Sequence, residues 1–473
     1  MSWSAQQSSG RIQKHLQSMQ PIDISDLTKE MNLEAVVSEV QCKRICGAHI
    51  YASMPRFTQL AFSYSDDASS RELMVAVHLY QQEVFRIVEQ VFQGYQVHFQ
   101  GPKLHAVLYQ PFHDEQKIAA CAVLLQLALE DFVQTVFRPL FPRLKIRGLT
   151  SGADFGKTIA TSNGLKNDRE MLFIGSAANY AAKILADDEQ NARITYNLYQ
   201  LLPQALKKLC TPIVSKISST QVYQVQRPER AAFLQLLRDY KISWDIEESK
   251  RQLHVKKDQF SRQSILIREE CSFKDIANLS IKNSRRIMAA SLFADVSGFT
   301  HYIEQAEKNL KKQKKALRIF HVIREEMAQI VRQDFQGIRV QFQGDRVQAL
   351  FAGDEHTIAH KAVQAAIGLQ SSMEAVIPSL LPQASELHLA IGIDLGTTLI
   401  SRLGVRKYRD PIYLGLAVEH ATQFEEGCNG KQITISRRVR KALSPALQSH
   451  FQLNQKLHCY TATGIIFAHT SNT

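Results

Sequence analysis

The stretch SLFADVSGFT (Ser291–Thr300), followed fifty residues later by QFQGDRVQALF (Gln341–Phe351), carries the strongest structural signal in this 473-residue chain. Each segment places one aspartate, Asp295 or Asp345, at the end or turn of an apolar strand. Two carboxylates held in this way can bind two divalent metal ions over a nucleoside triphosphate, for an in-line phosphoryl displacement. The small residues after Asp295 lead into the start of a helix, an arrangement typical of phosphate binding.

The two halves of the chain repeat this pattern in the same order. The offsets between four matching anchors are 242, 243, 244 and 240 residues, nearly constant along the chain. The anchors pair HIYASMPRFT (49–58) with the Ser291 stretch, FQGP (99–102) with FQGD (342–345), IRGLTSG (146–152) with AIGIDLG (390–396), and FIGSAANYAAKI (173–184) with YLGLAVEHATQF (413–424). The sequence therefore predicts two related domains in tandem.

Both halves alternate apolar β-type segments with amphipathic helices, which predicts an α/β (α+β) sandwich with helices against a sheet. We place an N-terminal arm with a short helix at residues 1–40 and a first domain at 41–225. A charged segment with scattered apolar residues predicts a helical connector at 226–285. The second domain, with both aspartates, follows at 286–473.

Composition limits the classes of function that are open. The hydrophobic content is 45%, no apolar run approaches the roughly 18 residues that span a bilayer, and the N-terminus lacks a signal-peptide pattern. We therefore expect a cytoplasmic protein without a membrane partner. The net charge of +12 is spread over the chain without a nucleic-acid-binding motif, so we expect no nucleic-acid partner. Seven irregularly spaced cysteines predict reduced thiols.

The motifs of the second half resemble those of the class III nucleotidyl cyclases, the family of adenylate and guanylate cyclases. Phe293, Asp295 and Gly298 match the first metal motif of that family, and Asp345 matches the second. The resemblance implies two ferredoxin-like domains paired head to tail, with each site built from both. The second half departs from the family later, where Glu419 and Gln423 replace an asparagine and an arginine.

The first half departs in the opposite sense. Ser53 and Pro102 occupy its two aspartate positions, whereas Asn179 is retained and Lys183 replaces the arginine with another cation. The two halves therefore lack complementary parts of one machinery. The resemblance implies an intramolecular pseudo-dimer with one competent site and one degenerate site.

The resemblance also implies the chemistry and the residues of that site. Asp295, Asp345 and the backbone carbonyl of Val296 would hold two Mn²⁺ or Mg²⁺ ions, for which oxygen ligands are suitable. Asn179 would orient the ribose, and Lys183 would stabilise charge on the α-phosphoryl oxygens. The ribose 3′-hydroxyl would then displace pyrophosphate to give a 3′,5′-cyclic monophosphate. The predicted nucleotide contacts are Tyr51, His98, Phe299, Thr300 and Lys431.

The motifs indicate the nucleobase of the substrate less directly than they indicate the reaction. Purine cyclases of this family read the base with a lysine–aspartate or a glutamate–cysteine pair, and His98 and Leu172 occupy those positions here. CGAHIYASMPRF (46–57) and LSIKNSRRIMAASLFADVSGFT (279–300) are similar to the pyrimidine cyclases of Pycsar anti-phage defence. That similarity implies cyclic UMP or cyclic CMP as the product and a separate protein as its effector. The side chains leave uracil and cytosine both open.

Two alternatives stay open at this point. One is a divergent adenylate cyclase that makes cyclic AMP from ATP. The other is a catalytically silent, nucleotide-binding regulatory module on the same fold. Assays with each of the four nucleoside triphosphates separate these hypotheses.

Overall fold

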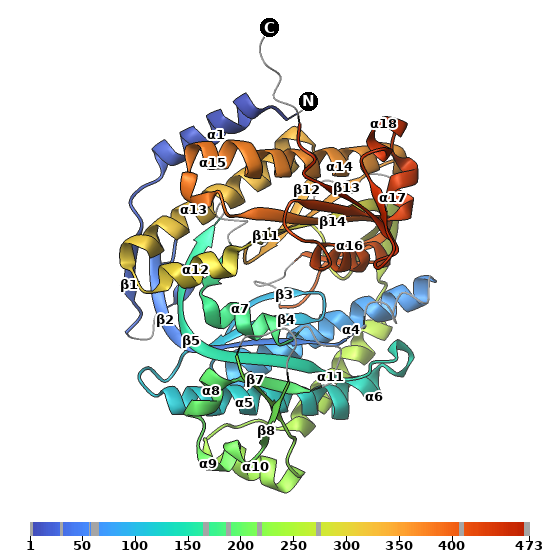
Figure 1. The fold of residues 1–473 in the computed structure, drawn as a ribbon. Helices are drawn as coiled ribbons and strands as arrows, with labels where there is room; N and C mark the ends of the chain where they lie inside the picture. Colours follow the sequence, from blue (N-terminus) through green and yellow to red (C-terminus); the bar gives the residue numbers. More distant parts are fainter. Residues whose placement is uncertain are drawn as a thin grey trace.

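The computed structural model describes residues 3–28, 32–55, 57, 66–163, 170–185, 191–214, 220–270, 276–405 and 411–467. The chain forms two lobes, each with one nine-stranded sheet, which are stacked on each other in Figure 1. We call them the N-lobe and the C-lobe. The two sheets have the same strand order and the same pairing, as the internal repeat predicts.

The N-lobe sheet has the order β3-β4-β2-β5-β7-β9-β8, with β1 parallel to β2 and β6 antiparallel to β5. Its long central strands bury alternating or continuous apolar residues, because helices cover the outer face. Its strands are β1 (Asp23–Asp26), β2 (Gln41–Ser53), β3 (Tyr95–Gln100), β4 (Lys103–Leu108), β5 (Thr150–Asn163), β6 (Glu170–Ile174), β7 (Ala192–Thr195), β8 (Cys210–Ile213) and β9 (Val222–Val225).

The C-lobe sheet repeats this topology in the order β12-β13-β11-β14-β16-β18-β17, with β10 parallel to β11 and β15 antiparallel to β14. Its strands are β10 (Leu266–Glu270), β11 (Asn283–Ser297), β12 (Ile338–Gln343), β13 (Arg346–Ala352), β14 (His388–Arg402), β15 (Pro411–Leu414), β16 (Gln432–Ile435), β17 (Gln452–Asn454) and β18 (Cys459–Thr463).

The helices also repeat, down to their N-terminal caps. Asp114 caps α5 and Asp354 caps α14, each accepting from a backbone N–H three residues later. The N-lobe helices are α4 (Asp67–Phe85), α5 (Glu115–Phe132), α6 (Arg138–Leu140), α7 (Ser176–Lys183), α8 (Tyr196–Leu201) and α9 (Gln204–Lys207). The C-lobe helices are α12 (Phe299–Glu307), α13 (Leu310–Gln329), α14 (Glu355–Ser371), α15 (Ile377–Leu380), α16 (Leu416–Glu426), α17 (Arg437–Ala442) and α18 (Pro445–Gln448).

Each lobe contributes apolar residues to the core of the other. Ile159, Leu172 and Ile174, from the β5–β6 hairpin, belong to the hydrophobic cluster of the C-lobe. Leu399 and Leu414, from the β14–β15 hairpin, belong to that of the N-lobe. We call these two hairpins the exchanged arms. Because each arm continues directly into a helix, α7 or α16, the exchange places both helices between the sheets (Figure 1).

The predicted N-terminal arm joins both lobes. Its helix α1 (Ala5–Ser18) packs on the C-lobe, where Trp3 stacks on Phe467 with 5.6 Å between ring centroids, and β1 then enters the N-lobe sheet. A single turn, α2 (Leu33–Val36), precedes β2. The predicted connector contains the helices α10 (Arg230–Asp239) and α11 (Ile246–Ser261). It ends in strand β10, which the charged sequence LIREE concealed.

One described helical stretch, Glu115–Leu140, is long and apolar enough to cross a membrane by length and composition alone. Polar and charged residues interrupt it, so no long uninterrupted apolar run marks it in the sequence. In the fold it is the central core helix of the N-lobe, and 83% of its most apolar window is buried inside the protein. Its apolar character therefore reflects packing under the sheet.

The strand register corrects one anchor of the repeat. Gly152 lies opposite Tyr51 in β2, and Gly392 lies opposite Phe293 in β11, so Gly152 and Gly392 are equivalent. The segment that matches AIGIDLG is thus TSGADFG (150–156), and the pairing with IRGLTSG was wrong by four residues. The physical reason is close packing: a Cβ on Gly152 would lie 2.5 Å from the carbonyl oxygen of Ala181 in α7.

Arg11 anchors α1, and we predict that Arg11→Ala lowers the free energy of unfolding by roughly 3 kcal/mol. Its guanidinium lies 2.7 Å from Glu326 and 2.9 Å from Asp334, whose side chains are only 2% and 8% exposed. Without Arg11 two buried carboxyl groups lose their cation. Denaturant unfolding midpoints measure the effect. Arg251→Ala, at an exposed ion pair with Glu248, is the control and should change stability by less than about 0.5 kcal/mol; equal losses in both variants would refute the anchor.

Candidate active site

A cavity of about 650 Å³ lies between the two lobes, and we call it the central cavity. Both lobes line it, because the exchanged arms hold α7 against the C-lobe. Six of the residues selected from the sequence line this one cavity: Tyr51, His98, Asn179, Lys183, Asp295 and Asp345. The acidic members come from the C-lobe, and the amide and ammonium groups come from the N-lobe.

Local backbone geometry positions the two aspartates. Asp295 lies near the end of β11, and Gly298 then turns the chain into α12 with φ of +90°. Asp345 lies in the two-residue turn between β12 and β13, after Gly344 with φ of +63°. Such φ values strongly favour glycine. In the N-lobe the equivalent turn is Gly101–Pro102, where proline suits the second position of the turn but supplies no carboxylate.

The two carboxyl groups repel each other in this setting. Burial, followed by the charge of Asp295, raises the pKa of Asp345 well above its ordinary value. Burial also raises the pKa of Asp295, while Arg346 and Lys183 act in the opposite direction. An adjacent pair of buried carboxyl groups of this kind is stabilised by a cation placed between them.

The donor set fits a hard divalent cation. Asp295 and Asp345 offer oxygen atoms, which Mg²⁺ and Mn²⁺ prefer. Within the described residues no group of three or more His, Cys, Asp and Glu side chains has the arrangement of a complete metal site. Two carboxylates would supply only part of a coordination shell and would leave positions for substrate oxygens, as in metal sites that act on phosphates.

Helix α7 carries the N-lobe contribution. The absence of a side chain at Gly152 lets α7 pack tightly on β5, and the bond from Asn179 Nδ2 to Thr300 Oγ1, 3.3 Å long, ties α7 to α12 of the C-lobe. Tyr180 strengthens this contact by donating from its hydroxyl to Glu304 over 3.0 Å. Asn179 and Lys183, one helical turn apart, both reach the central cavity.

Four other predicted residues do not line the central cavity. The side chains of Val296 and Phe299 are buried in the C-lobe core, where Phe299 stacks on Phe320. Thr300 contacts the cavity indirectly, as the hydrogen-bond partner of Asn179. Lys431 forms an ion pair of 3.1 Å with Glu374. Nucleotide or metal contacts by these four groups, including the Val296 carbonyl, stay predictions.

Sequence reasoning missed two cations that line the cavity, Lys103 and Arg346. They occupy equivalent positions directly after the hairpin turns, so the strings FQGPK and FQGDR contained the signal. Burial and the nearby Arg346 lower the pKa of Lys103 to about 8. Arg346 donates to Glu425 over 2.9 Å and lies over the Phe293 ring. The cavity thus holds two cations that the motifs did not indicate, together with the carboxyl groups of Glu425 and Glu426.

At the N-lobe end of the cavity the lining is mainly aromatic, with the Lys103 ammonium 5.9 Å from the centre of the Tyr51 ring. Tyr51 stacks on His105 with 4.1 Å between centroids, and His98 meets the same ring edge to face. Behind them, His49 Nδ1 is 3.1 Å from His105 Nε2, and His49 Nε2 is 3.0 Å from Thr158. Burial lowers the pKa of His49 and of His98 to about 3, and that of His105 well below its ordinary value. All three imidazoles are therefore neutral at physiological pH.

Comparison with known proteins bears on the fold and the class of protein. Residues 282–464 match the family described as "Adenylate and Guanylate cyclase catalytic domain". A solved structure from Pseudomonas aeruginosa, described as a class III adenylyl cyclase-like ATP-binding protein, superposes with a TM-score of 0.82 over 99% of both chains at 24% identity. The predicted fold class, two cyclase domains in tandem, is confirmed. The C-lobe matches the cyclase catalytic domain, and the sequence relatives support a nucleotide cyclase enzyme.

The relatives found by sequence similarity have more specific names. A uridylate cyclase from Pseudomonas aeruginosa is 28% identical over 96% of this chain and 89% of its own length. A second uridylate cyclase, from a Rhizobium species, is also 28% identical, over 82% of this chain and 77% of its own length. The similarity therefore extends over both lobes, including the one without the metal aspartates.

The neutral histidines predict a specific loss of stability in acid. Because the pKa of His49 is about 3 in the fold and near 6.5 in the unfolded chain, protonation favours unfolding. The contribution of His49 is complete above pH 6.5, falls as the pH drops toward 3, and is reduced by roughly 2 kcal/mol at about pH 5. We expect His49→Asn to flatten the dependence of the urea midpoint on pH between 7.5 and 5. His254→Asn, at an exposed site of α11, should retain the parent slope; parallel profiles for all three proteins would contradict the assignment.

Proposed function

We propose that this protein converts UTP to 3′,5′-cyclic UMP and pyrophosphate at the central cavity. One observation carries the proposal: a pair of carboxylates from the C-lobe faces an amide and an ammonium from the N-lobe across one cavity. The mirrored set, which consists of the residues at the equivalent positions of the opposite lobes, lacks these functional groups, and this supports a single working site. Its members Pro102, Glu419 and Gln423 do not line the central cavity, and Ser53, which does, has no carboxylate.

Phosphoryl transfer of this kind is accelerated mainly by positive charge around the phosphates and by orientation of the reacting groups, rather than by covalent catalysis. Asp295 and Asp345, with the backbone carbonyl of Val296, would hold two divalent ions, Mg²⁺ or Mn²⁺. Such ions, when bound, favour ionisation of the ribose 3′-hydroxyl and neutralise the triphosphate. The new bond joins O3′ to the α-phosphorus, and the bond from that phosphorus to the pyrophosphate oxygen breaks.

The side chains of the N-lobe would orient and stabilise the reacting groups. Asn179 would hold the ribose by hydrogen bonds, which favours the near-attack geometry. Lys183 would donate to the α-phosphoryl oxygens as charge develops there. Its field already reaches the metal carboxylates, since it opposes the rise in the pKa of Asp295. Lys103 and Arg346 would add positive charge around the same phosphates.

The aromatic end of the cavity, with its neutral imidazoles, favours a pyrimidine base. Neutral His98 and the Tyr51 hydroxyl can each donate or accept a hydrogen bond, and they replace the charged pair with which purine cyclases of the family read the base. Stacked rings at Tyr51 and His105 offer a surface for a planar heterocycle. Uracil rather than cytosine is favoured by the relatives, whose names describe uridylate cyclases.

The biological setting follows from the product. A cyclic nucleotide acts by binding a receptor, so we propose a separate effector protein that responds to cyclic UMP. The similarity to pyrimidine cyclases of anti-phage defence supports a role as a second-messenger enzyme in that response. Because nucleoside triphosphates are abundant in the cytoplasm, we propose that the protein acts there.

Substrate preference tests the proposal directly. The purified chain is incubated with each of ATP, GTP, CTP and UTP in the presence of Mn²⁺ or Mg²⁺, and products are separated by liquid chromatography. We expect cyclic UMP as the main product and no turnover after chelation of the metal. Cyclic AMP from ATP alone would support the divergent adenylate cyclase instead, and binding of nucleotide without product would support a silent module.

Matched variants test the division of labour between the lobes. Asn179→Ala and Lys183→Ala should each lower kcat by about 10²–10³-fold, because each removes a group that stabilises the transition state. Asp345→Asn should lower it at least as much. Gln423→Ala, at the exposed position of α16 that mirrors Lys183, is the control and should retain parent activity. Equal rates for Lys183→Ala and Gln423→Ala would exclude the shared site.

A further inference from the structure

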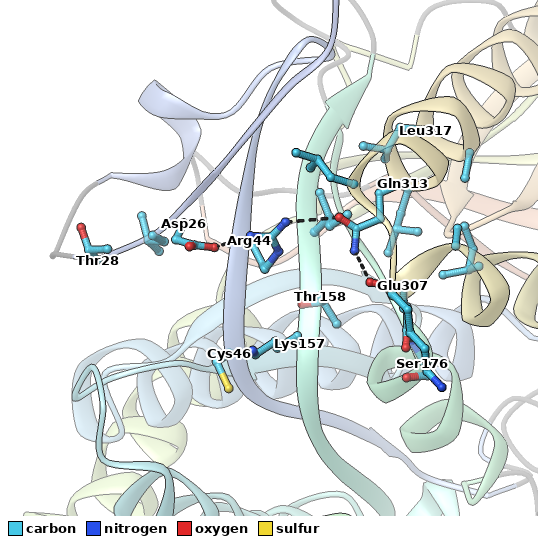
Figure 2. Close-up of a pocket in the computed structure, with 18 of the residues that line it drawn as sticks. Asp26, Thr28, Arg44, Cys46, Lys157, Thr158, Ser176, Glu307, Gln313 and Leu317 are labelled. Carbon is cyan, nitrogen blue, oxygen red and sulfur yellow. Dashed lines mark hydrogen bonds and ion pairs between the residues drawn. The ribbon is translucent and has the colours of Figure 1, made fainter.

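A second cavity of about 680 Å³ lies apart from the central cavity, and the proposed function does not use it. We call it the second cavity (Figure 2). One wall consists of β2 and β5 of the N-lobe, and the other consists of α12 and α13 of the C-lobe. Its size is that of a typical small-molecule site. Its members are also not the mirror image of the central cavity, since Pro102, Glu419 and Gln423 are absent from its lining.

The C-lobe wall of the second cavity is apolar. Ile303 and Ala306 come from α12, while Leu310 and Leu317 come from α13. The Leu310 side chain is 48% exposed, an unusual position for a large hydrophobic residue in this chain. A ligand that covered Leu310 would remove this surface from water, which favours binding of an apolar group.

The N-lobe wall is cationic. Arg44 already has partners, because it donates to Asp26 over 2.6 Å and to Gln313 over 3.2 Å (Figure 2). Lys157 of β5 and Lys308, which lies on the C-lobe side at the end of α12, differ: in the described parts of the chain no carboxylate lies within ion-pair distance of either one. Two uncompensated ammonium groups beside an apolar wall favour a ligand with an anionic head and an apolar body.

The chemistry of the cavity favours reversible binding. Its one thiol, Cys46, has its pKa raised to about 11 by burial and by the charge of Glu115. The thiol therefore stays protonated at neutral pH and is a poor nucleophile. Charge and shape, rather than a covalent bond, would hold the ligand.

Two helices connect the second cavity to the central one. Glu307, at the end of α12, accepts from the Ser176 backbone N–H at the start of α7 over 2.7 Å, and both residues line the second cavity. At its other end α7 presents Lys183 to the central cavity. An anion in the second cavity would compete with Glu307 for the N-terminus of α7, where negative charge is favoured. Any resulting shift of α7 moves Asn179 and Lys183.

We propose that the second cavity binds a small amphipathic anion and that this ligand adjusts the nucleotidyl cyclase reaction through α7. The binding claim is independent of the substrate, whereas the regulatory claim rests on the proposed function. The ligand class is defined by an anionic group near Lys157 and Lys308 and an apolar group against Leu310. The site gives the enzyme an input that is separate from its substrate.

Fluorescence titration with 8-anilinonaphthalene-1-sulfonate tests the binding claim, because this probe combines a sulfonate with an apolar ring system. We expect saturable binding that Lys157→Glu and Leu310→Glu each weaken at least tenfold. The uncharged analogue N-phenyl-1-naphthylamine should bind at least tenfold more weakly. Lys441→Glu and Leu453→Glu, at exposed positions outside both cavities, are the matched controls and should change the affinity by less than twofold.

Two results would overturn the binding site. One is equal probe affinity in Lys157→Glu, Leu310→Glu and the controls, with circular dichroism showing that all are folded. The other is displacement of the probe by a non-hydrolysable UTP analogue in direct competition, which would place the probe in the central cavity. Lys157→Gln provides a milder second variant, for which we expect a smaller loss in the same direction.

The coupling has its own readout. With UTP as substrate, the probe should change kcat/KM at least twofold, with the half-maximal concentration found by fluorescence, and Lys157→Glu should abolish the change. Probe binding without any effect on the rate would overturn the coupling and leave the site. If the chain turns over none of the four nucleoside triphosphates, the proposed function fails, while the fluorescence comparison still decides whether the site exists.

Discussion

The mutual exchange of apolar arms between the lobes is the constraint on which the active site depends. The side chains of Ile159, Leu172 and Ile174, in strands of the N-lobe sheet, pack in the C-lobe core, and those of Leu399 and Leu414 do the reverse. The exchange is reinforced by Glu170, which pairs over 2.8 Å with an Arg324 guanidinium that is almost fully buried. Because each arm leads straight into α7 or α16, the same burial that joins the lobes also aims the helix at the opposing sheet.

The two lobes share this architecture but differ in the charged residues at their hairpin turns. The hairpin turns remain alike in the two lobes, with glycine at positive φ in both, yet one turn ends in Asp345 and the other in Pro102. Proline keeps the turn geometry and removes the charge, so the N-lobe retains its architecture without a carboxylate pair. The cations Lys103 and Arg346 occupy equivalent places, and both line the cavity that holds Asp295 and Asp345.

Sequence reasoning predicted the parts of the site that have strong local signals. Asp295 and Asp345 follow apolar strands with glycine at obligatory turns, and Asn179 and Lys183 were assigned through the resemblance to class III cyclases together with the internal repeat. Arg346 and Lys103 escaped because a basic residue in a strand usually lies in solvent, and only the packed hairpins show them in the cavity. His105 escaped because its partners His49 and Tyr51 lie more than fifty residues away in the sequence.

Three other differences between the predicted and the observed structure also have physical causes. The anchor at 146–152 was displaced by four residues because similar glycines recur along that strand, and only contact with α7 distinguishes them. Strand β10 was concealed because it pairs in parallel at the sheet margin and stays largely exposed, without alternating apolar residues. Phe299 looked like a ligand contact in the motif, yet its ring packs in the core.

The docking of α1 has a consequence for biosynthesis. Its partners Glu326, Asp334 and Ser372, and the Phe467 ring stacked on Trp3, all leave the ribosome long after α1 itself. The first helix must therefore wait, undocked, through most of translation. Docking of α1 is a late step of assembly, because it follows the synthesis of the C-lobe residues that α1 contacts.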